Sequence, residues 1–125
     1  RFRVLADERP AGRRAPTALA HAAAGVAFCY MTQLGRYIEY RKYKVRGLRV
    51  VQTNRFSVTG RAEDFSLRGG AAPFDTHVFL NADEPDEVMQ TLLEVAENTC
   101  YLHAALRSAL PGSVEVALND TPVSA

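Results

Sequence analysis

The sequence has no tryptophan, two cysteines among 125 residues, and no long run of apolar side chains. Two cysteines are too few for a disulfide scaffold, and such a pair in a cytoplasmic protein is more often reactive or simply buried than bridged. A membrane-spanning helix needs about 18 or more consecutive apolar residues, so we expect no membrane span. No signal-peptide pattern is visible, and we expect a cytoplasmic protein.

A strong charge of one sign is also lacking. Fifteen Lys and Arg against fourteen Asp and Glu give a formal net charge of +1, which offers no electrostatic reason to expect a nucleic-acid partner. The length suggests one domain that can bury a core without disulfide or metal staples. Because the chain begins with Arg1 rather than Met, we expect a fragment or the later part of a longer protein.

Two long helices are expected from the composition and the apolar spacing. Pro16 suits the first turn of a helix, and the alanine-rich residues 17–40 predict one long helix. This segment has almost no charged side chain before Arg36, which is typical of a helix that is buried on all sides. Residues 83–109 have an acidic start and apolar positions at helical spacing, so they predict a second helix.

Alternation of apolar and polar residues predicts strands over residues 2–5, 48–60, 76–82 and 113–119. A bulge is expected near Thr53 and Asn54, and the glycine-bearing residues 61–73 are expected to form a loop. Helices and strands are partly segregated along the chain, which favours an α+β fold with an antiparallel sheet over alternating βαβ units.

The candidate chemistry lies at the two cysteines, one on each predicted helix. Cys29 and Cys100 can share a site only if those helices pack together, since a bridge needs Cα atoms within about 4.4–6.8 Å. If they meet, a thiolate can attack a peroxide oxygen, the resulting sulfenic acid can condense with the second thiol, and an external thiol can restore the pair. On spacing alone, buried structural cysteines are the more frequent case, because free cysteine often behaves as a small hydrophobe.

A reactive thiolate inside an apolar helix needs a nearby cation, because burial raises the pKa of a thiol. Arg13 and Arg14 precede the first helix, and Arg36 lies about two turns after Cys29. An apolar pocket would favour an organic peroxide over hydrogen peroxide, and the side chains expected to form it are Phe28, Tyr30 and Met31.

A metal site is the other way to combine these residues. His21 lies eight residues before Cys29, and His103 lies three after Cys100, so a Cys2His2 zinc site is geometrically conceivable. The spacing matches no usual zinc motif, and we expect no metal and no other cofactor.

Three segments of the chain resemble the OsmC/Ohr family, named for osmotically inducible protein C and organic hydroperoxide resistance protein. They are the loop from Asp7 to Pro16, residues 27–33 (AFCYMTQ) and residues 96–100 (AENTC). The resemblance implies a single OsmC-like α+β domain over residues 1–125 that lacks the family's first strands. It would have a curved antiparallel sheet, a long buried central helix and a second long helix, in an intertwined homodimer with active sites at the interface.

The resemblance also implies a peroxidase that reduces organic hydroperoxides, with Cys29 as the attacking thiolate, Cys100 as the resolving thiol, and a dithiol reductant of the lipoyl type. The family's catalytic arginine usually comes from the missing strands, so Arg14 is the candidate in its place. Two positions depart from the family pattern: Thr17 replaces a glutamate of the organic-hydroperoxide branch, and Tyr101 replaces a frequent proline. An OsmC-like dimer that binds an apolar small molecule without peroxidase activity is therefore the alternative.

Overall fold

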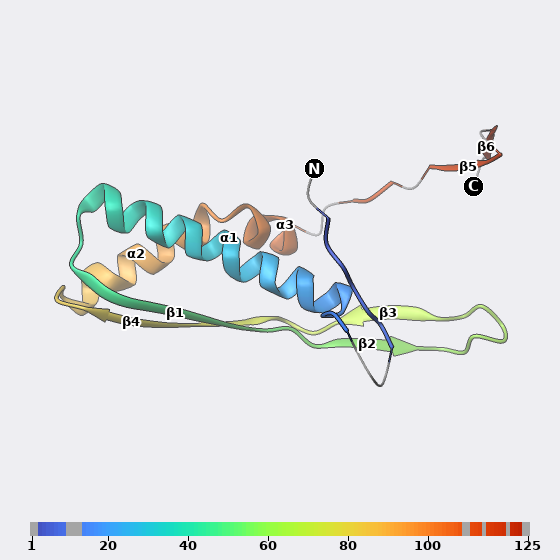
Figure 1. Ribbon diagram of the computed structural model, residues 1–125, viewed down its shortest axis with the longest axis horizontal. Helices are drawn as coiled ribbons and strands as arrows, with labels where there is room; N and C mark the ends of the chain where they lie inside the picture. Colours follow the sequence, from blue (N-terminus) through green and yellow to red (C-terminus); the bar gives the residue numbers. More distant parts are fainter. Residues whose placement is uncertain (1–2, 10–13, 109–110, 114, 120, 124–125) are drawn as a thin grey trace.

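The computed structural model describes residues 3–9, 14–108, 111–113, 115–119 and 121–123, and it has the predicted α+β composition (Figure 1). In chain order the elements are α1 (Ala18–Arg41), β1 (Val45–Thr53), β2 (Phe56–Thr59), β3 (Arg68–Ala71), β4 (Asp75–Ala82), α2 (Asp86–Asn98), α3 (Tyr101–Arg107), β5 (Val116–Leu118) and β6 (Thr121–Val123). None of the helices in these ranges is long and apolar enough to cross a membrane.

The strands of the main body form one long antiparallel ribbon (Figure 1). β1 pairs with β4, and β2 pairs with β3. The single strand predicted over residues 48–60 is therefore two strands, with the break beside the expected irregularity at Asn54. The loop prediction for residues 61–73 was wrong at β3, where Gly70 pairs with Ser57 so closely that a Cβ would lie 2.8 Å from the Ser57 Oγ. Gly69 and Gly70 are therefore paired residues of a strand and not part of a turn.

Helix α1 begins and ends close to the predicted positions. The Thr17 hydroxyl accepts a hydrogen bond from the Ala20 N–H at 3.0 Å, which caps the first turn. The expectation that this helix is buried on all sides was wrong. One face is buried, whereas Phe28 on another face is 65% exposed, because α2, α3 and the β1–β4 pair cover one side of the helix in the single chain.

The second predicted helix is broken into α2 and α3. The Thr99 hydroxyl donates to the carbonyl of Val95 at 2.8 Å, and Cys100 has extended backbone angles (φ −78°, ψ 112°). The helical spacing of the apolar residues continues across this break, so the sequence pattern did not show it. The break places Cys100 at the start of α3 instead of in the middle of a helix.

The outer segments differ from the predictions as well. Residues 3–5 of the first predicted strand form no strand, and residue 2 lies outside the described residues. The last predicted strand is present in part as β5, which pairs with β6 through a turn at Asn119 (φ 51°), while Val114 lies outside the described residues. This hairpin lies away from the helices (Figure 1).

The core lies between α1, α2 and the inward face of the β1–β4 pair. Apolar residues alternate along β4, with Val78 and Leu80 directed inward. The most buried members of the core are Tyr30, Leu34, Met89, Leu92, Ala96 and Cys100. One of the two candidate thiols is therefore part of the core, and α1 carries the other beside it.

Candidate functional site

The structure brings the two cysteines together. Cys29 lies on α1 and Cys100 lies at the start of α3, and these helices pack against each other. The Cys29 side chain packs against the core cluster that contains Cys100 and lies close enough to raise the pKa of its thiol, and both thiols are free. Residues 71 positions apart in the sequence thus form one dithiol site.

The two sulfurs differ in accessibility, and burial changes the acidity of the inner one. Cys29 is half-buried, whereas Cys100 is 0% exposed. Burial raises the pKa of the Cys100 thiol, the backbone N–H of His103 lowers it, and the contact with the Cys29 side chain raises it again. Cys100 is therefore held as a thiol, and Cys29 is the sulfur that a molecule from solvent can reach.

A buried histidine lies directly against Cys100. The Nδ1 atom of His103 is 3.1 Å from the Cys100 Sγ. Its ring contacts two aromatic rings, with centroid distances of 5.0 Å to Tyr30 and 5.4 Å to Phe74. Burial lowers the pKa of His103, so its imidazole is neutral near pH 7.

A polar chain leads from this histidine into the strand pair. The Nε2 atom of His103 is 3.4 Å from the Thr76 Oγ1, and the Thr76 hydroxyl donates to the Gln52 Oε1 at 2.7 Å. Gln52 on β1 and Thr76 on β4 are directly opposite in the antiparallel register. The strand pairing therefore positions the histidine, which in turn contacts the buried thiol.

A pocket of about 260 Å³ opens beside this histidine. Arg107 on α3 and Glu97 on α2 form an ion pair of 3.0 Å at the pocket, and both are about half exposed. Of the three residues expected to line an apolar pocket, Tyr30 lines this one, while Phe28 and Met31 do not. Its lining residues are Tyr30, Phe74, Thr76, Glu97, His103 and Arg107.

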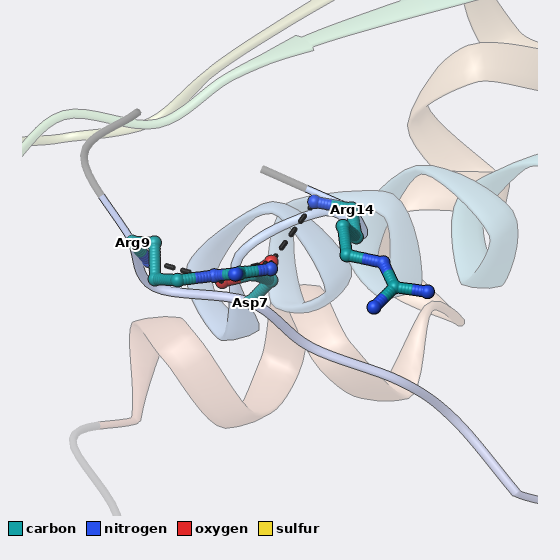
Figure 2. A network of polar contacts seen from close by, with 3 residues as sticks. All are labelled: Asp7, Arg9 and Arg14. Carbon is teal, nitrogen blue, oxygen red and sulfur yellow. Dashed lines mark hydrogen bonds and ion pairs between the residues drawn. The ribbon is translucent and has the colours of Figure 1, made fainter. Parts of the chain in front are cut away.

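Arg14 lies in the segment before α1 (Figure 2). Its backbone N–H donates to the Asp7 Oδ2 at 2.9 Å, and Figure 2 shows its guanidinium directed away from Asp7. Within the described ranges no hydrogen bond joins this guanidinium to Cys29 or Cys100. Arg13 lies outside the described residues. Arg36 is exposed and donates to the Gln33 Oε1 at 3.3 Å.

Comparison with known proteins identifies the family. A family model described as OsmC-like protein matches residues 10–115. The chain belongs to the OsmC-like family. A search of curated proteins found no match.

Solved structures agree with this assignment. An OsmC-like hydroperoxide resistance protein from Jannaschia sp. CCS1 is 26% identical with a TM-score of 0.78, and the match covers 99% of this chain and 79% of that one. Two more distant structures share the fold. An OsmC-like protein from Mycoplasma pneumoniae has 17% identity and a TM-score of 0.71, over 85% and 73% of the two chains. The organic hydroperoxide resistance protein OhrB of Bacillus subtilis has 21% identity and a TM-score of 0.52, over 78% and 67%.

The zinc alternative finds no support in this OsmC-like chain. The His21 Nε2 atom contacts the Leu5 carbonyl oxygen at 2.9 Å. Across the described part of the chain, no three His, Cys, Asp or Glu side chains are grouped as metal ligands. His103 contacts Cys100, as the three-residue spacing suggested, but within a Cys–His pair rather than a four-ligand site.

Sequence reasoning missed three residues of this OsmC-like site: Gln52, Thr76 and Arg107. Arg107 follows Cys100 by seven residues, which is two helical turns, so the spacing alone could have placed it beside the site. Gln52 and Thr76 carry no such signal, because the pairing register of β1 and β4 brings them to His103.

Proposed function

We propose that this OsmC-like protein is a thiol-dependent peroxidase that reduces organic hydroperoxides, with Cys29 as the attacking thiolate and Cys100 as the resolving thiol. The observation that carries the proposal is the contact between two free thiols of unequal accessibility. The hydroperoxide resistance protein of Jannaschia sp., similar over almost the whole chain, supports the substrate class.

The unequal burial of the sulfurs favours these two roles. A hydroperoxide has to reach the first sulfur from solvent, and Cys29 is the more accessible one. The resolving thiol has no such need, and Cys100 is fully buried against Cys29. Because burial also raises the pKa of Cys100, this residue stays protonated until Cys29 is oxidised.

The reaction balances in three steps. The Cys29 thiolate attacks the terminal peroxide oxygen, the O–O bond breaks, and the alkoxide takes a proton to leave as an alcohol. The Cys100 sulfur then attacks the Cys29 sulfenic acid, forming the disulfide and releasing the hydroxyl as water. An external dithiol reduces this disulfide by exchange and is itself oxidised to a disulfide. A dithiol of the lipoyl type is the proposed reductant.

Two further parts of the proposal concern Arg14 and a homodimer. Arg14 is the proposed cation that stabilises the Cys29 thiolate, because the family resemblance implies an arginine in this role; within the described residues of the single chain, its guanidinium forms no hydrogen bond with Cys29. Apolar side chains exposed beside the thiols, including Phe28 and the 76% exposed Tyr101, support a second copy of the chain as their cover. Light scattering would give the oligomeric state, and Arg14→Gln against Arg14→Lys would test the charge.

Mass spectrometry after one equivalent of an organic hydroperoxide tests the proposal directly. The wild type should lose two hydrogens as a disulfide, Cys100→Ser should accumulate a sulfenic acid at Cys29, and Cys29→Ser should form neither product. Cumene hydroperoxide should react faster than hydrogen peroxide. Wild-type thiols that stay free, or that oxidise no faster than a peptide thiol, would exclude the peroxidase and favour the small-molecule binding alternative.

A further inference from the structure

We propose that His103 is a catalytic residue whose Nδ1 accepts the proton of the Cys100 thiol as that sulfur attacks oxidised Cys29. The inference rests on the proposed function, because it assigns the proton of the resolving step. The observation that carries it is the 3.1 Å contact between Nδ1 and the Cys100 Sγ, which is within reach for proton transfer.

The hydrogen-bond chain behind the histidine leaves Nδ1 as the acceptor. The Thr76 hydroxyl gives its single hydrogen to the Gln52 Oε1, so it can only accept from the Nε2 of His103. The Gln52 amide is oriented for this role, because its Nε2 donates to the Asn54 Oδ1 at 2.9 Å. The ring proton therefore lies on Nε2, and the lone pair of Nδ1 faces the thiol.

The ring is also held in place. The Tyr30 and Phe74 rings contact it, and the side chain is 4% exposed. An activated nucleophile needs three parts: the attacking group, a base within hydrogen-bond distance of it, and a third group that orients the base. Cys100, His103 and Thr76 supply these parts here.

Several ionisable groups face His103 from the surrounding helices. The strand side contributes Gln52 and Thr76, which do not titrate. Burial lowers the pKa of His103, the Glu97 carboxylate raises it, and the Arg107 guanidinium lowers it. The ionisable groups around His103 are Cys29 and Tyr30 on α1, Glu97 on α2, and Cys100 and Arg107 at the two ends of α3. The lowered pKa keeps the imidazole neutral near pH 7, which is the form that can accept a proton.

The step conserves atoms and charge. Cys100 loses its proton to the His103 Nδ1 while its sulfur forms a bond to the Cys29 sulfur. The S–O bond of the sulfenic acid breaks, and the leaving hydroxide takes the proton back from the imidazolium as water. The histidine ends the step neutral, so it needs no external proton donor.

Single-turnover mixing with cumene hydroperoxide tests this role. A sulfenic-acid trap would report the first step at Cys29, and mass spectrometry of quenched samples would report the disulfide. His103→Asn should form the sulfenic acid at the wild-type rate and form the disulfide about 10²–10⁴-fold more slowly, the usual contribution of a general base. The disulfide rate of the wild type should fall as the pH drops and His103 becomes protonated, and the variant should lose this pH dependence. His77→Asn, which changes an exposed histidine on β4, is the matched control.

A second variant and a second assay cover the cases in which His103→Asn does not fold or the wild type forms no sulfenic acid. If His103→Asn does not fold, Thr76→Val retains the histidine but removes the acceptor of its Nε2 proton, and it should slow the disulfide step alone. If the wild type forms no sulfenic acid, the proposed function fails. The proton transfer can then be tested without peroxide, by preparing the mixed disulfide of Cys29 with thionitrobenzoate. Displacement of thionitrobenzoate by Cys100 should then be slower in the variant. The role of His103 would be overturned, in either assay, if the folded variants formed the disulfide at the same rate and with the same pH profile as the wild type.

Discussion

Cys29 on α1 packs against the core cluster that contains Cys100, at the start of α3, and raises the pKa of the Cys100 thiol, although 71 residues separate the two in the sequence. Cys100 lies at the break between α2 and α3, where its backbone is extended, and α3 packs against α1. Cys100 is also part of the core, so the position of this sulfur is determined by the same packing that stabilises the domain. The following predictions test that packing and the charges around the site.

Leu34→Ala should destabilise the protein by about 2–5 kcal/mol. Leu34 is 0% exposed and lies in the core cluster with Cys100, so its loss leaves a cavity. Urea unfolding at neutral pH measures the effect. Val58→Ala is the control, because this side chain is 71% exposed and its change should cost less than about 0.5 kcal/mol. Equal effects of the two substitutions would contradict the core assignment.

Tyr30→Phe should lower the free energy of unfolding by about 0.5–1.5 kcal/mol at neutral pH, since the Tyr30 hydroxyl donates to the Leu93 carbonyl at 3.0 Å. Burial raises the pKa of Tyr30 to about 12. The native state therefore holds this proton more tightly than the unfolded chain, whose tyrosine pKa is about 10. The resulting stability is complete below about pH 10 and is lost as the pH rises towards 12.

Stability curves across this alkaline range measure the second effect of Tyr30→Phe. The wild type should lose stability steeply above about pH 10, and the variant should lose less. Tyr40→Phe is the matched control, because Tyr40 is 79% exposed. An alkaline loss that is unchanged in Tyr30→Phe would show that another group causes it.

Glu97→Gln and Arg107→Gln should shift the pKa of His103 in opposite directions. The Glu97 carboxylate raises this pKa, so its removal should lower it, whereas removal of the Arg107 guanidinium should raise it. NMR titration of the His103 ring measures both shifts without any activity. Shifts of the same sign would mean that a change of structure, rather than a change of charge, dominates.

The acid stability of the wild type follows from the same histidine. Because its native pKa lies below the unfolded value of about 6.5, its contribution to stability is complete above that pH and is lost as the pH falls through the native pKa. Urea unfolding between neutral pH and pH 5 should show this loss in the wild type. His103→Asn should show a smaller loss, and His77→Asn should behave as the wild type.

Gly60→Ala should weaken the β2–β3 hairpin by about 1–3 kcal/mol. Gly60 has a φ of 88°, a strained region for other residues, and an added Cβ would overlap the Ser66 carbonyl oxygen. Hydrogen exchange of the β2 and β3 amides reports the change locally. Gly69→Ala is the control, because a Cβ there meets no atom within 4 Å. Equal exchange rates in the two variants would contradict the strained turn.

Local patterns in the sequence were sufficient for the elements whose signals are short-range. Alanine content and the Thr17 cap place α1, and alternation places β4, because helix propensity, capping and strand alternation act between near neighbours. The residues that resemble the OsmC/Ohr family also led to the correct family, and the structure packs α1, which carries Cys29, against α3, whose N-cap is Cys100.

The tertiary structure alone decided what depends on contacts between distant segments. The exposure of one face of α1 depends on what packs against it, and the helical spacing of residues 83–109 gave no sign of the break at Cys100. The link from Gln52 through Thr76 to His103 exists because β1 and β4 pair in one register. Strand pairing joins residues that no local pattern connects, so the sequence indicated His103 beside Cys100 but not the strand residues that contact this histidine.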